Sequence, residues 1–310
     1  MRIAAAEAAL SDFLAQCEAT GLWHRRHHSW ITALSGGPDS LALALIAERV
    51  ATARNIAHKA LIIDHGLRKT SAGEAAAVQA QMRSRGIPAE ILTIDHPKPA
   101  AGHQAWARHH RLQMLATHAR RKQACVLFGH HSGDQQETIA MRLARGSGLH
   151  GLAGIAPLRH YKGALFARPF LSFDKDELIQ LCQQLGGEYI TDPSNENTAF
   201  ERVRWRQMLA GEGELPDRLT RLSCASSALS GALDSATEKW INAHAVISAP
   251  LWAHIVYREF AALPEEHGIA IIAQVIKKIG HFEFAPGKSA MMATLKRVTG
   301  GLASTLAGCR

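Results

Sequence analysis

A glycine-rich segment near the N-terminus carries the first residues whose types and spacing could do chemistry. It reads SGGPDS from Ser35 to Ser40 and joins an apolar run to a stretch with helical apolar spacing. Gly36 and Gly37 allow a tight turn that brings backbone N–H groups close to an anion. A helix beginning near Pro38 would point its positive end at the same place, and the two serine hydroxyls add donors. The segment therefore predicts a phosphate-binding loop.

Asp39 lies inside this loop, where a carboxylate would repel a phosphate. The repulsion is relieved if a divalent cation bridges the two groups, so the segment indicates Mg²⁺ together with phosphates. The lysine of a Walker loop is absent from the segment. The alternative is an ordinary glycine-rich connection between a strand and a helix, in which Asp39 only caps the helix.

Two further polar segments are candidates for the same site. One is DHGLR, from Asp64 to Arg68, and the other is GHHSGDQQET, from Gly129 to Thr138. Each follows a short apolar run, as SGGPDS does. Because ligands of parallel sheets bind beyond the carboxyl ends of the strands, we expect the three segments to converge in space.

The elements that would position these segments alternate along the first half of the chain. Short apolar runs predict strands at residues 30–34, 60–63, 91–94 and 125–128. Amphipathic stretches predict helices at residues 41–54, 72–85, 104–121 and 135–145. Strands alternating with helices are typical of βαβ units, in which helices cover both faces of a parallel sheet. We therefore predict an α/β fold with a doubly wound parallel sheet.

The composition favours a globular chain with a polyanionic partner. The 310 residues suffice for two domains, and no apolar run approaches the roughly 20 residues that span a membrane. Lys and Arg number 35 against 27 Asp and Glu, a net charge of +8. The surplus occurs in short clusters at residues 24–28, 107–111, 119–122 and 201–206. Together they favour RNA or DNA as partner, although each cluster alone is more typical of a solvated surface.

The cysteines and the N-terminus indicate the compartment. Cys17, Cys125, Cys182, Cys224 and Cys309 are far apart and form no CxxC pair. They predict a reducing, cytoplasmic location and argue against a cysteine-based zinc or iron–sulfur site. The first residues carry acids within an apolar pattern, which favours an amphipathic helix over a signal peptide.

With these neighbours, SGGPDS resembles the PP-loop of the N-type ATP pyrophosphatases, which cleave ATP between the α and β phosphates. Further motifs over residues 29–210 resemble those of the tRNA(Ile)-lysidine synthetase family and come in its order. They are DHGLR, GHHSGDQQET, RLARGSGLHGLAGI from Arg142, RPFL from Arg168 and DPSNENTAFERVRWR from Asp192. RGSGxxGL and DPSN are the most specific of them. The resemblance implies a Rossmann-like PP-loop domain with a parallel sheet of five strands.

The resemblance also implies a carbon–nitrogen ligase that uses ATP and Mg²⁺. In that family, ATP adenylates the C2 carbonyl oxygen of the wobble cytidine in an isoleucine tRNA with a CAU anticodon. The ε-amine of free L-lysine then attacks C2, AMP leaves and lysidine results. The expected partners are this tRNA and L-lysine, with no membrane. The oligomeric state stays open, a homodimer included.

The resemblance assigns the nucleotide and the chemistry to two groups of residues. Nucleotide binding falls to Ser35, Gly36, Gly37, Pro38, Asp39, Ser40, Asp64 and His65, with Asp39 also holding Mg²⁺. The expected catalytic residues are Asp39, Arg108 and Arg206. A fixed guanidinium suits this role because it makes bidentate contacts with phosphate and stabilises charge that develops there. Arg108 could instead be an ordinary exposed helix residue.

Two more groups are expected to contact the other substrates. Asp134 and Glu137 are spaced i, i+3, so both can face the lysine ammonium from one helical turn. The alternative is a capping box, with Asp134 as N-cap of a helix and Glu137 as its partner. Contacts with tRNA are expected from Arg145, Arg202 and Arg204.

The chain departs from the family pattern at two positions. Gly133 replaces the first aspartate of H-x-D-D-Q, and Leu112 replaces the aromatic residue that commonly follows the arginine matching Arg111. Two other functions remain open. One is 2-thiolation of tRNA by another PP-loop enzyme, which would require paired reactive cysteines. The other is RNA binding without catalysis.

We place a domain boundary where the phosphate-binding signals end. Residues 1–212 form the predicted PP-loop adenylation domain, and residues 213–310 form a mainly helical domain that we expect to contact tRNA. The family often carries a further C-terminal tRNA-binding module, and the chain stops after a strand-like run. We therefore expect a short or truncated member of the family.

Overall fold

The computed structural model describes residues 2–19, 29–66, 70–97, 99, 101–190, 197–248, 252–280, 286–302 and 304–306. The HRRHH cluster, part of DHGLR and the DPSN motif lie outside these residues. The chain divides into two compact units. Unit 1 comprises residues 1–141 and 155–220, and unit 2 comprises residues 142–154 and 221–310. Relative to the boundary expected after residue 212, unit 2 begins within a long helix and also includes a short earlier segment.

Unit 1 is built on a six-stranded sheet with the spatial order β3-β2-β1-β4-β6-β5. Its strands are β1 (Ser29–Leu34), β2 (Ala57–Asp64), β3 (Ala89–Thr93), β4 (Ala124–Leu127), β5 (Leu158–Tyr161) and β6 (Ala164–Ala167). All neighbouring pairs are parallel except β5 with β6. The predicted parallel sheet of five strands is confirmed, and β5 adds an antiparallel edge. The strand order reverses between β1 and β4, and ligands of open α/β sheets bind at such a switch point.

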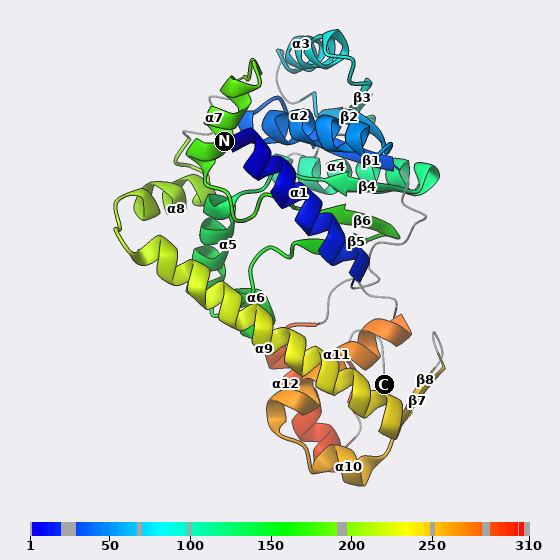
Figure 1. Cartoon of the computed structure of the whole chain (residues 1–310). Coiled ribbons are helices and arrows are strands. Elements are labelled where there is room, and N and C mark those ends of the chain that lie inside the picture. Colours follow the sequence, from blue (N-terminus) through cyan, green and yellow to red (C-terminus); the bar gives the residue numbers. More distant parts are fainter. Residues whose placement is uncertain are drawn as a thin grey trace. The chain divides into compact units, whose positions relative to one another are not determined.

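Helices cover both faces of this sheet (Figure 1). One face carries α1 (Arg2–Ala19), α2 (Pro38–Ala53), α3 (Ser71–Ser84) and α7 (Lys175–Gln184). The other face carries α4 (His103–Lys122), whose Leu115 and Ala119 pack among buried strand residues such as Val126 and Phe166. The α5 helix (Ser132–Ala144) follows β4, and α8 (Glu201–Ala210) follows later in the chain. The doubly wound arrangement and the N-terminal amphipathic helix are therefore as predicted.

The hairpin of β5 and β6 has no counterpart among the predicted elements. Each strand has four residues, which is too short for a periodicity signal. The two residues between them, Lys162 and Gly163, have φ of +46° and +77°. Two positive φ values define a type I′ turn, and lysine is an unusual first residue for it, so the turn signal is weak as well.

Unit 2 is mainly helical, as expected. It contains α6 (Leu149–Leu152), most of α9 (Leu215–His244), α10 (Tyr257–Ala261), α11 (Glu265–Gly280) and α12 (Lys288–Thr299). A two-stranded hairpin, β7 (Ala245–Ser248) with β8 (Trp252–Ile255), completes it. Its core is aliphatic and centres on α11, where Ile271 is fully buried and packs near Ile241 and Leu295.

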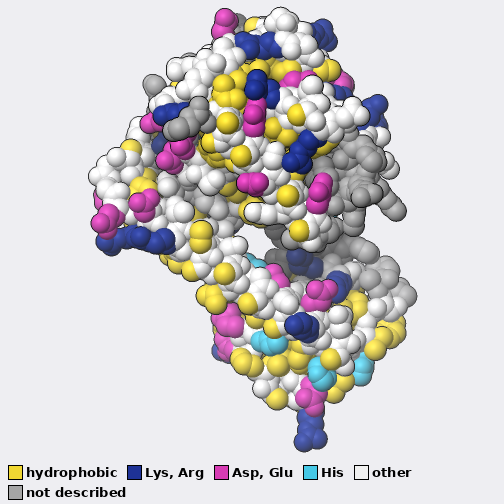
Figure 2. Space-filling view, viewed as in Figure 1, with side chains coloured by type: hydrophobic (Ala, Val, Ile, Leu, Met, Phe, Trp, Pro, Cys, Tyr) yellow, Lys and Arg dark blue, Asp and Glu magenta, His cyan; other side chains and the backbone are white. Residues whose placement is uncertain are grey.

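The surface carries its basic side chains in separate groups. On the face that Figure 2 shows, Lys and Arg lie in small clusters with acidic side chains among them. This agrees with the short basic clusters of the sequence. Within the described residues, no helix combines the length and the apolar character needed to cross a membrane.

Candidate active site

A cavity of about 620 Å³, partly open to solvent, lies at the carboxyl ends of β1, β2 and β4. Its lining residues are Ala33, Leu34, Ser35, Asp39, Ser40, Leu61, Ile63, His65, Arg111, Phe128, Gly129 and His130. They come from all three polar segments predicted to converge, and α4 adds Arg111. The convergence expected from sheet topology is therefore confirmed.

The SGGPDS loop forms the wall of this cavity next to α2. Gly36 has φ of +86°, and a Cβ there would lie 3.0 Å from Val78 Cγ2, so the turn requires glycine. The Ser40 hydroxyl donates to the Gly37 carbonyl and accepts the Ser35 backbone N–H at 3.2 Å. These bonds fold the loop back onto the first turn of α2. The first N–H groups of any helix have no acceptor within the helix, so this end of α2 suits a phosphate.

Gly129 brings the third segment close to the same helix. A Cβ on it would lie 2.8 Å from the Asp39 carbonyl oxygen and 2.9 Å from the Ser40 nitrogen, both of them backbone atoms. Backbone cannot move aside as a flexible side chain can. Position 129, two residues after the end of β4, must therefore be glycine for the GHHSGDQQET segment to reach the phosphate-binding loop.

Asp39 has the surroundings of a metal ligand. Its Oδ1 atom is buried and has no hydrogen-bond partner within the described chain, and Oδ2 lies 3.9 Å from His131 Nε2. Burial raises the pKa of this carboxyl above its usual range, although the nearby positive charges oppose the shift. An unpartnered buried carboxylate oxygen fits a cation.

A metal at Asp39 would depend on few protein ligands. The described residues contain no group of three or more His, Cys, Asp and Glu side chains arranged to hold a metal ion. Mg²⁺ usually binds through one or two carboxylates together with substrate phosphates and water. The residues present therefore fit Mg²⁺ carried with a nucleotide.

Two arginines lie at or near the cavity. Arg111 lines it, whereas Arg168 donates through Nη1 to the Ala156 carbonyl and lies over the ring of Phe128, which lines the cavity. The Nε atoms of Arg111 and Arg168 are buried, and neither has a hydrogen-bond partner among the residues that the structure describes. Burial, and then the charge of Arg108, lowers the pKa of Arg111 to about 10. Burial, and then the charges of Arg159 and Arg108, lowers that of Arg168 to about 10. These arginines repel one another, so the binding of an anion such as phosphate among them is favourable.

Two histidines of the cavity are held neutral. Burial lowers the pKa of His65, and the charge of Arg111 lowers it further. Burial also lowers the pKa of His130 to about 3, against the attraction of Asp134. A neutral imidazole can donate through one nitrogen and accept through the other, which suits hydrogen bonding to a nucleotide.

The expected catalytic Arg108 and the observed Arg111 occupy one face of α4. They are three residues apart, so they follow each other by about one helical turn. Arg108 is exposed and does not line the cavity, whereas Arg111 does. Arg108 is still close enough to lower the pKa of both buried arginines.

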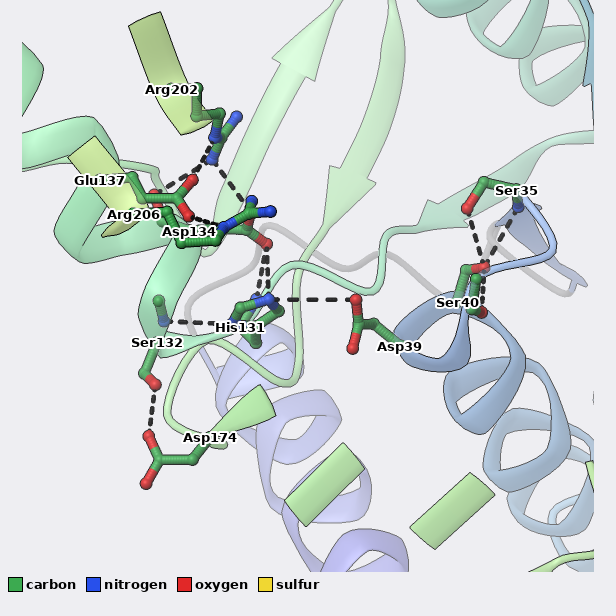
Figure 3. A network of polar contacts seen from close by, with 12 residues as sticks. Ser35, Asp39, Ser40, His131, Ser132, Asp134, Glu137, Asp174, Arg202 and Arg206 are labelled. Atoms are coloured by element: carbon green, nitrogen blue, oxygen red, sulfur yellow. Dashed lines mark hydrogen bonds and ion pairs between the residues drawn. The ribbon is translucent and has the colours of Figure 1, made fainter. Parts of the chain in front are cut away.

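Glu137 is the acceptor for two arginines of α8 (Figure 3). Its carboxylate accepts Arg202 Nε at 2.5 Å on one oxygen and Arg206 Nε at 2.6 Å on the other. The Glu137 side chain is 3% exposed, and each arginine side chain 35%. Burial opposes the charge of Arg206, but the bond to Glu137 raises the pKa of its guanidinium. Glu137 therefore fixes two arginines of α8 beside the start of α5.

Asp134 shares this network and also closes the first turn of α5. Its Oδ1 accepts Arg202 Nη2 at 3.0 Å, and its Oδ2 accepts the His131 backbone N–H at 3.1 Å. Burial would raise the pKa of Asp134, but the charges of His131 and Arg202 lower it. The helix begins at Ser132, so Asp134 is its third residue; the alternative of Asp134 as N-cap with Glu137 as partner is wrong. Both carboxylates do face one partner, Arg202, as their i, i+3 spacing predicts.

His131 joins the two ends of the site. Its Nδ1 accepts the Gly133 backbone N–H at 3.1 Å, and this bond orients the ring. Its Nε2 lies between the two aspartates, 3.6 Å from Asp134 Oδ2 and 3.9 Å from Asp39 Oδ2 (Figure 3). The ring thus links the phosphate-binding loop to the carboxylate network.

A second cavity, of about 740 Å³ and partly open to solvent, is lined in part by Glu137. It is lined by Ser132, Gly133, Gln136, Glu137, Asp174, Lys175, Asp176, Arg206, Leu209, Ala210 and Pro216. Three of these are carboxylates, and Asp174 is held by the Ser132 hydroxyl. The second cavity therefore places Asp174 and Asp176 near Lys175 and the ion pair of Glu137 with Arg206.

Three other predicted residues lie elsewhere. Asp64 Oδ1 accepts the Gly66 backbone N–H at 2.8 Å and does not line the cavity. Arg204 is exposed and donates to the carbonyl oxygens of Thr198 and Ala199, ahead of α8. Arg145 is exposed and belongs to unit 2.

Sequence reasoning missed His131 and Arg168 as site residues. Both lie in motifs that the sequence displays, GHHSGDQQET and RPFL. For His131 the signal was the position of GHHSGDQQET after a predicted strand, whereas RPFL follows β6, which the sequence did not predict. The histidine pair was weighed only as a metal-ligand pattern, and the arginine only as part of a motif.

Comparisons with known proteins agree with this geometry. A family profile described as a PP-loop domain matches residues 5–212. A tRNA(Ile)-lysidine synthase of Methylobacterium sp. (strain 4-46) is 38% identical over 83% of this chain and 75% of its own length. The protein of that name from Hyphomonas neptunium is 34% identical over 90% of this chain and 77% of its own.

A solved structure agrees on the fold. A U34-tRNA thiolase from Methanococcus maripaludis with its [4Fe-4S] cluster superposes with a TM-score of 0.54 at 16% identity, over 72% of this chain and 79% of that one. At this identity the likeness concerns the fold alone. The family match and the two relatives go further: the chain belongs to the tRNA(Ile)-lysidine synthase family of PP-loop proteins.

Proposed function

We propose that the chain ligates L-lysine to C2 of the wobble cytidine in isoleucine tRNA with a CAU anticodon. The reaction consumes ATP, passes through an adenylated tRNA and releases pyrophosphate and AMP. The observation that carries the proposal is one cavity that joins a helix N-terminus, an unpartnered carboxylate oxygen of Asp39 and an unpartnered Nε of Arg111. The membership of the family supplies the substrate class.

In the first step, the phosphate-binding loop holds ATP. The phosphates bind to the backbone N–H groups of Gly36 and Gly37 and to the hydroxyls of Ser35 and Ser40. Pro38 begins the first turn of α2 behind these groups. Asp64 ends β2 and His65 follows it, on the opposite side of the nucleotide. Asp39 would hold Mg²⁺, which neutralises phosphate charge. The cytidine C2 oxygen attacks the α phosphorus, and pyrophosphate leaves. Arg108, Arg111 and Arg206 stabilise the negative charge that grows on the phosphates, because fixed donors need no reorganisation during the step.

In the second step, lysine approaches from the second cavity. A carboxylate has about four lone-pair positions, so Glu137 can hold two arginines and still accept an ammonium. Asp134 lies at the inner end of the same network, and Asp174 and Asp176 line the cavity. These carboxylates attract the positively charged ε-ammonium of lysine. The ammonium must lose a proton before its nitrogen can attack C2. AMP leaves as the carbon–nitrogen bond forms.

The tRNA backbone is the proposed partner of the exposed arginines. Arg145 and Arg204 are exposed, and a guanidinium suits a phosphate diester. Arg202 is the exception among the predicted tRNA contacts, because its bonds to Asp134 and Glu137 give it a part in the network. We propose that it acts by positioning this network.

The test is incorporation of radiolabelled lysine into an isoleucine tRNA transcript bearing CAU, with ATP and Mg²⁺. The proposal predicts incorporation that is lost when the wobble cytidine is replaced. Pyrophosphate release without incorporation would keep an adenylating PP-loop enzyme and reject lysine as the nucleophile. The absence of both would favour an RNA-binding protein without catalysis.

A further inference from the structure

Four aromatic rings gather on the N-terminal part of α4 and on the segment after β3. The His96 and His110 rings are stacked, with centroids 4.5 Å apart and an interplanar angle of 29°. Trp106 lies 5.0 Å from His110, and His109 meets His110 edge to face at 5.4 Å. We call His96, Trp106, His109 and His110 the ring cluster.

The ring cluster has no part in the core. Among the described residues, Trp106 belongs to neither core cluster of unit 1, although other residues of α4 do. His96 and His109 are exposed, and Trp106 and His110 are half-buried. Because Trp106 is half-buried, part of its large ring surface is open to a partner.

Three residues of the ring cluster lie on α4, the helix that contributes Arg111 to the nucleotide cavity. His110 directly precedes Arg111, which lines that cavity, and His96 follows the carboxyl end of β3. Residues 94–112 contain a single acid, Asp95, against three Lys and Arg residues. A flat aromatic surface in basic surroundings complements a nucleic acid, whose bases stack on rings while its phosphates meet the cations.

We propose that the ring cluster stacks an unpaired nucleobase of the RNA substrate, next to the base that enters the active site. This inference rests on the proposed function and adds a binding position to it. The ring of Trp106 supplies the stacking face, His110 packs beside it and is itself stacked on His96, and Arg108 lies on the same helix. Histidine and tryptophan both stack on bases irrespective of their identity, so the position contributes affinity and no sequence preference.

The test measures binding of an anticodon stem-loop RNA to the full chain. Replacing Trp106 with alanine should raise the dissociation constant about 5- to 150-fold, the range that 1–3 kcal/mol per stacked base corresponds to. Trp106→Phe should restore most of the affinity, because it keeps an aromatic face. His103→Ala is the matched control, because His103 is exposed on the same helix and in none of these ring contacts.

A paired change in the RNA identifies the base. Abasic sites are introduced one at a time next to the reacting cytidine; at the stacked position, Trp106→Ala should then cause no further loss. In turnover, the KM for RNA should rise while kcat at saturation stays within about twofold, and ATP affinity should not change. Loss of ATP affinity with unchanged RNA affinity would show that the rings serve adenine and would overturn the proposal. If the wild-type chain binds the RNA and Trp106→Ala binds it equally well, the stacking proposal is overturned and the proposed function stands. If the wild-type chain does not bind the RNA, the proposed function is overturned as well.

Discussion

Replacing Glu137 with glutamine separates two roles that its position allows. Glu137 was expected from sequence to bind the lysine ammonium, yet in the structure both its oxygens accept arginine Nε–H groups. If Glu137 positions Arg202 and Arg206, adenylation should suffer before lysine is present. If it serves lysine alone, adenylation should be normal and the KM for lysine should rise.

The magnitude follows from the contacts. Glutamine keeps the shape but offers one oxygen, and its NH₂ group would face the second Nε–H, donor against donor. Breaking one partner of a buried ion pair costs about 3–5 kcal/mol. The arginine side chains are 35% exposed, which lowers this to about 2–3 kcal/mol. At 1.4 kcal/mol for each factor of ten, the adenylation rate should fall roughly 30- to 150-fold.

The assay is single-turnover release of pyrophosphate from ATP, with tRNA and without lysine. Glu214→Gln is the matched control, since its bond to Arg218 joins two exposed side chains and should contribute little. Circular dichroism should show that both variants are folded. Adenylation at the wild-type rate in Glu137→Gln, with a raised KM for lysine, would refute the positioning role.

Three further predictions follow from single contacts. Asp39→Asn should keep the fold and lose about 100-fold or more in pyrophosphate release, with weaker dependence of ATP binding on Mg²⁺; turnover like the wild type would remove Asp39 from the site. Gly133→Asp, which restores the family residue, should lower kcat, because a Cβ there would lie 2.9 Å from the buried His131 ring; equal or higher activity would contradict this. Glu48 has its pKa lowered from 4.5, chiefly by the hydrogen bond from His58, so its stabilisation is present above pH 4.5 and lost as the pH falls through the lowered value. Glu48→Gln should therefore be about 1 kcal/mol less stable than wild type at pH 7 in urea unfolding, and this difference should shrink as the pH falls below 4.5. A difference that stays constant as the pH falls would contradict the assignment.

The parallel sheet and the phosphate-binding loop were predictable because each leaves a local signal. Short buried strands read as apolar runs, and the glycines of SGGPDS satisfy a backbone requirement that few residues can meet. Gly36 does have the positive φ that such a loop needs. Topology then placed the three polar segments at one edge of the sheet.

The pairing of side chains was not predictable, because it depends on contacts between distant parts of the chain. Glu137 and Arg206 are far apart in sequence, and nothing in either segment says that one binds the other. The same holds for Arg111, which differs from the exposed Arg108 only by its place on α4. The spacing of Arg108 and Arg111 predicts that they share a helix face. Which of the two lines the cavity depends on how α4 packs against the sheet.

A pulse–chase experiment shows whether lysine incorporation passes through an adenylated tRNA. The chain is incubated with α-labelled ATP, Mg²⁺ and isoleucine tRNA in the absence of lysine, and lysine is then added. We predict that labelled adenylate forms on the tRNA before lysine is added. After the addition, the label should be released as AMP at the same rate at which lysine is incorporated. Lysine incorporation without a tRNA-bound adenylate, or an adenylate that lysine does not discharge, would contradict the account.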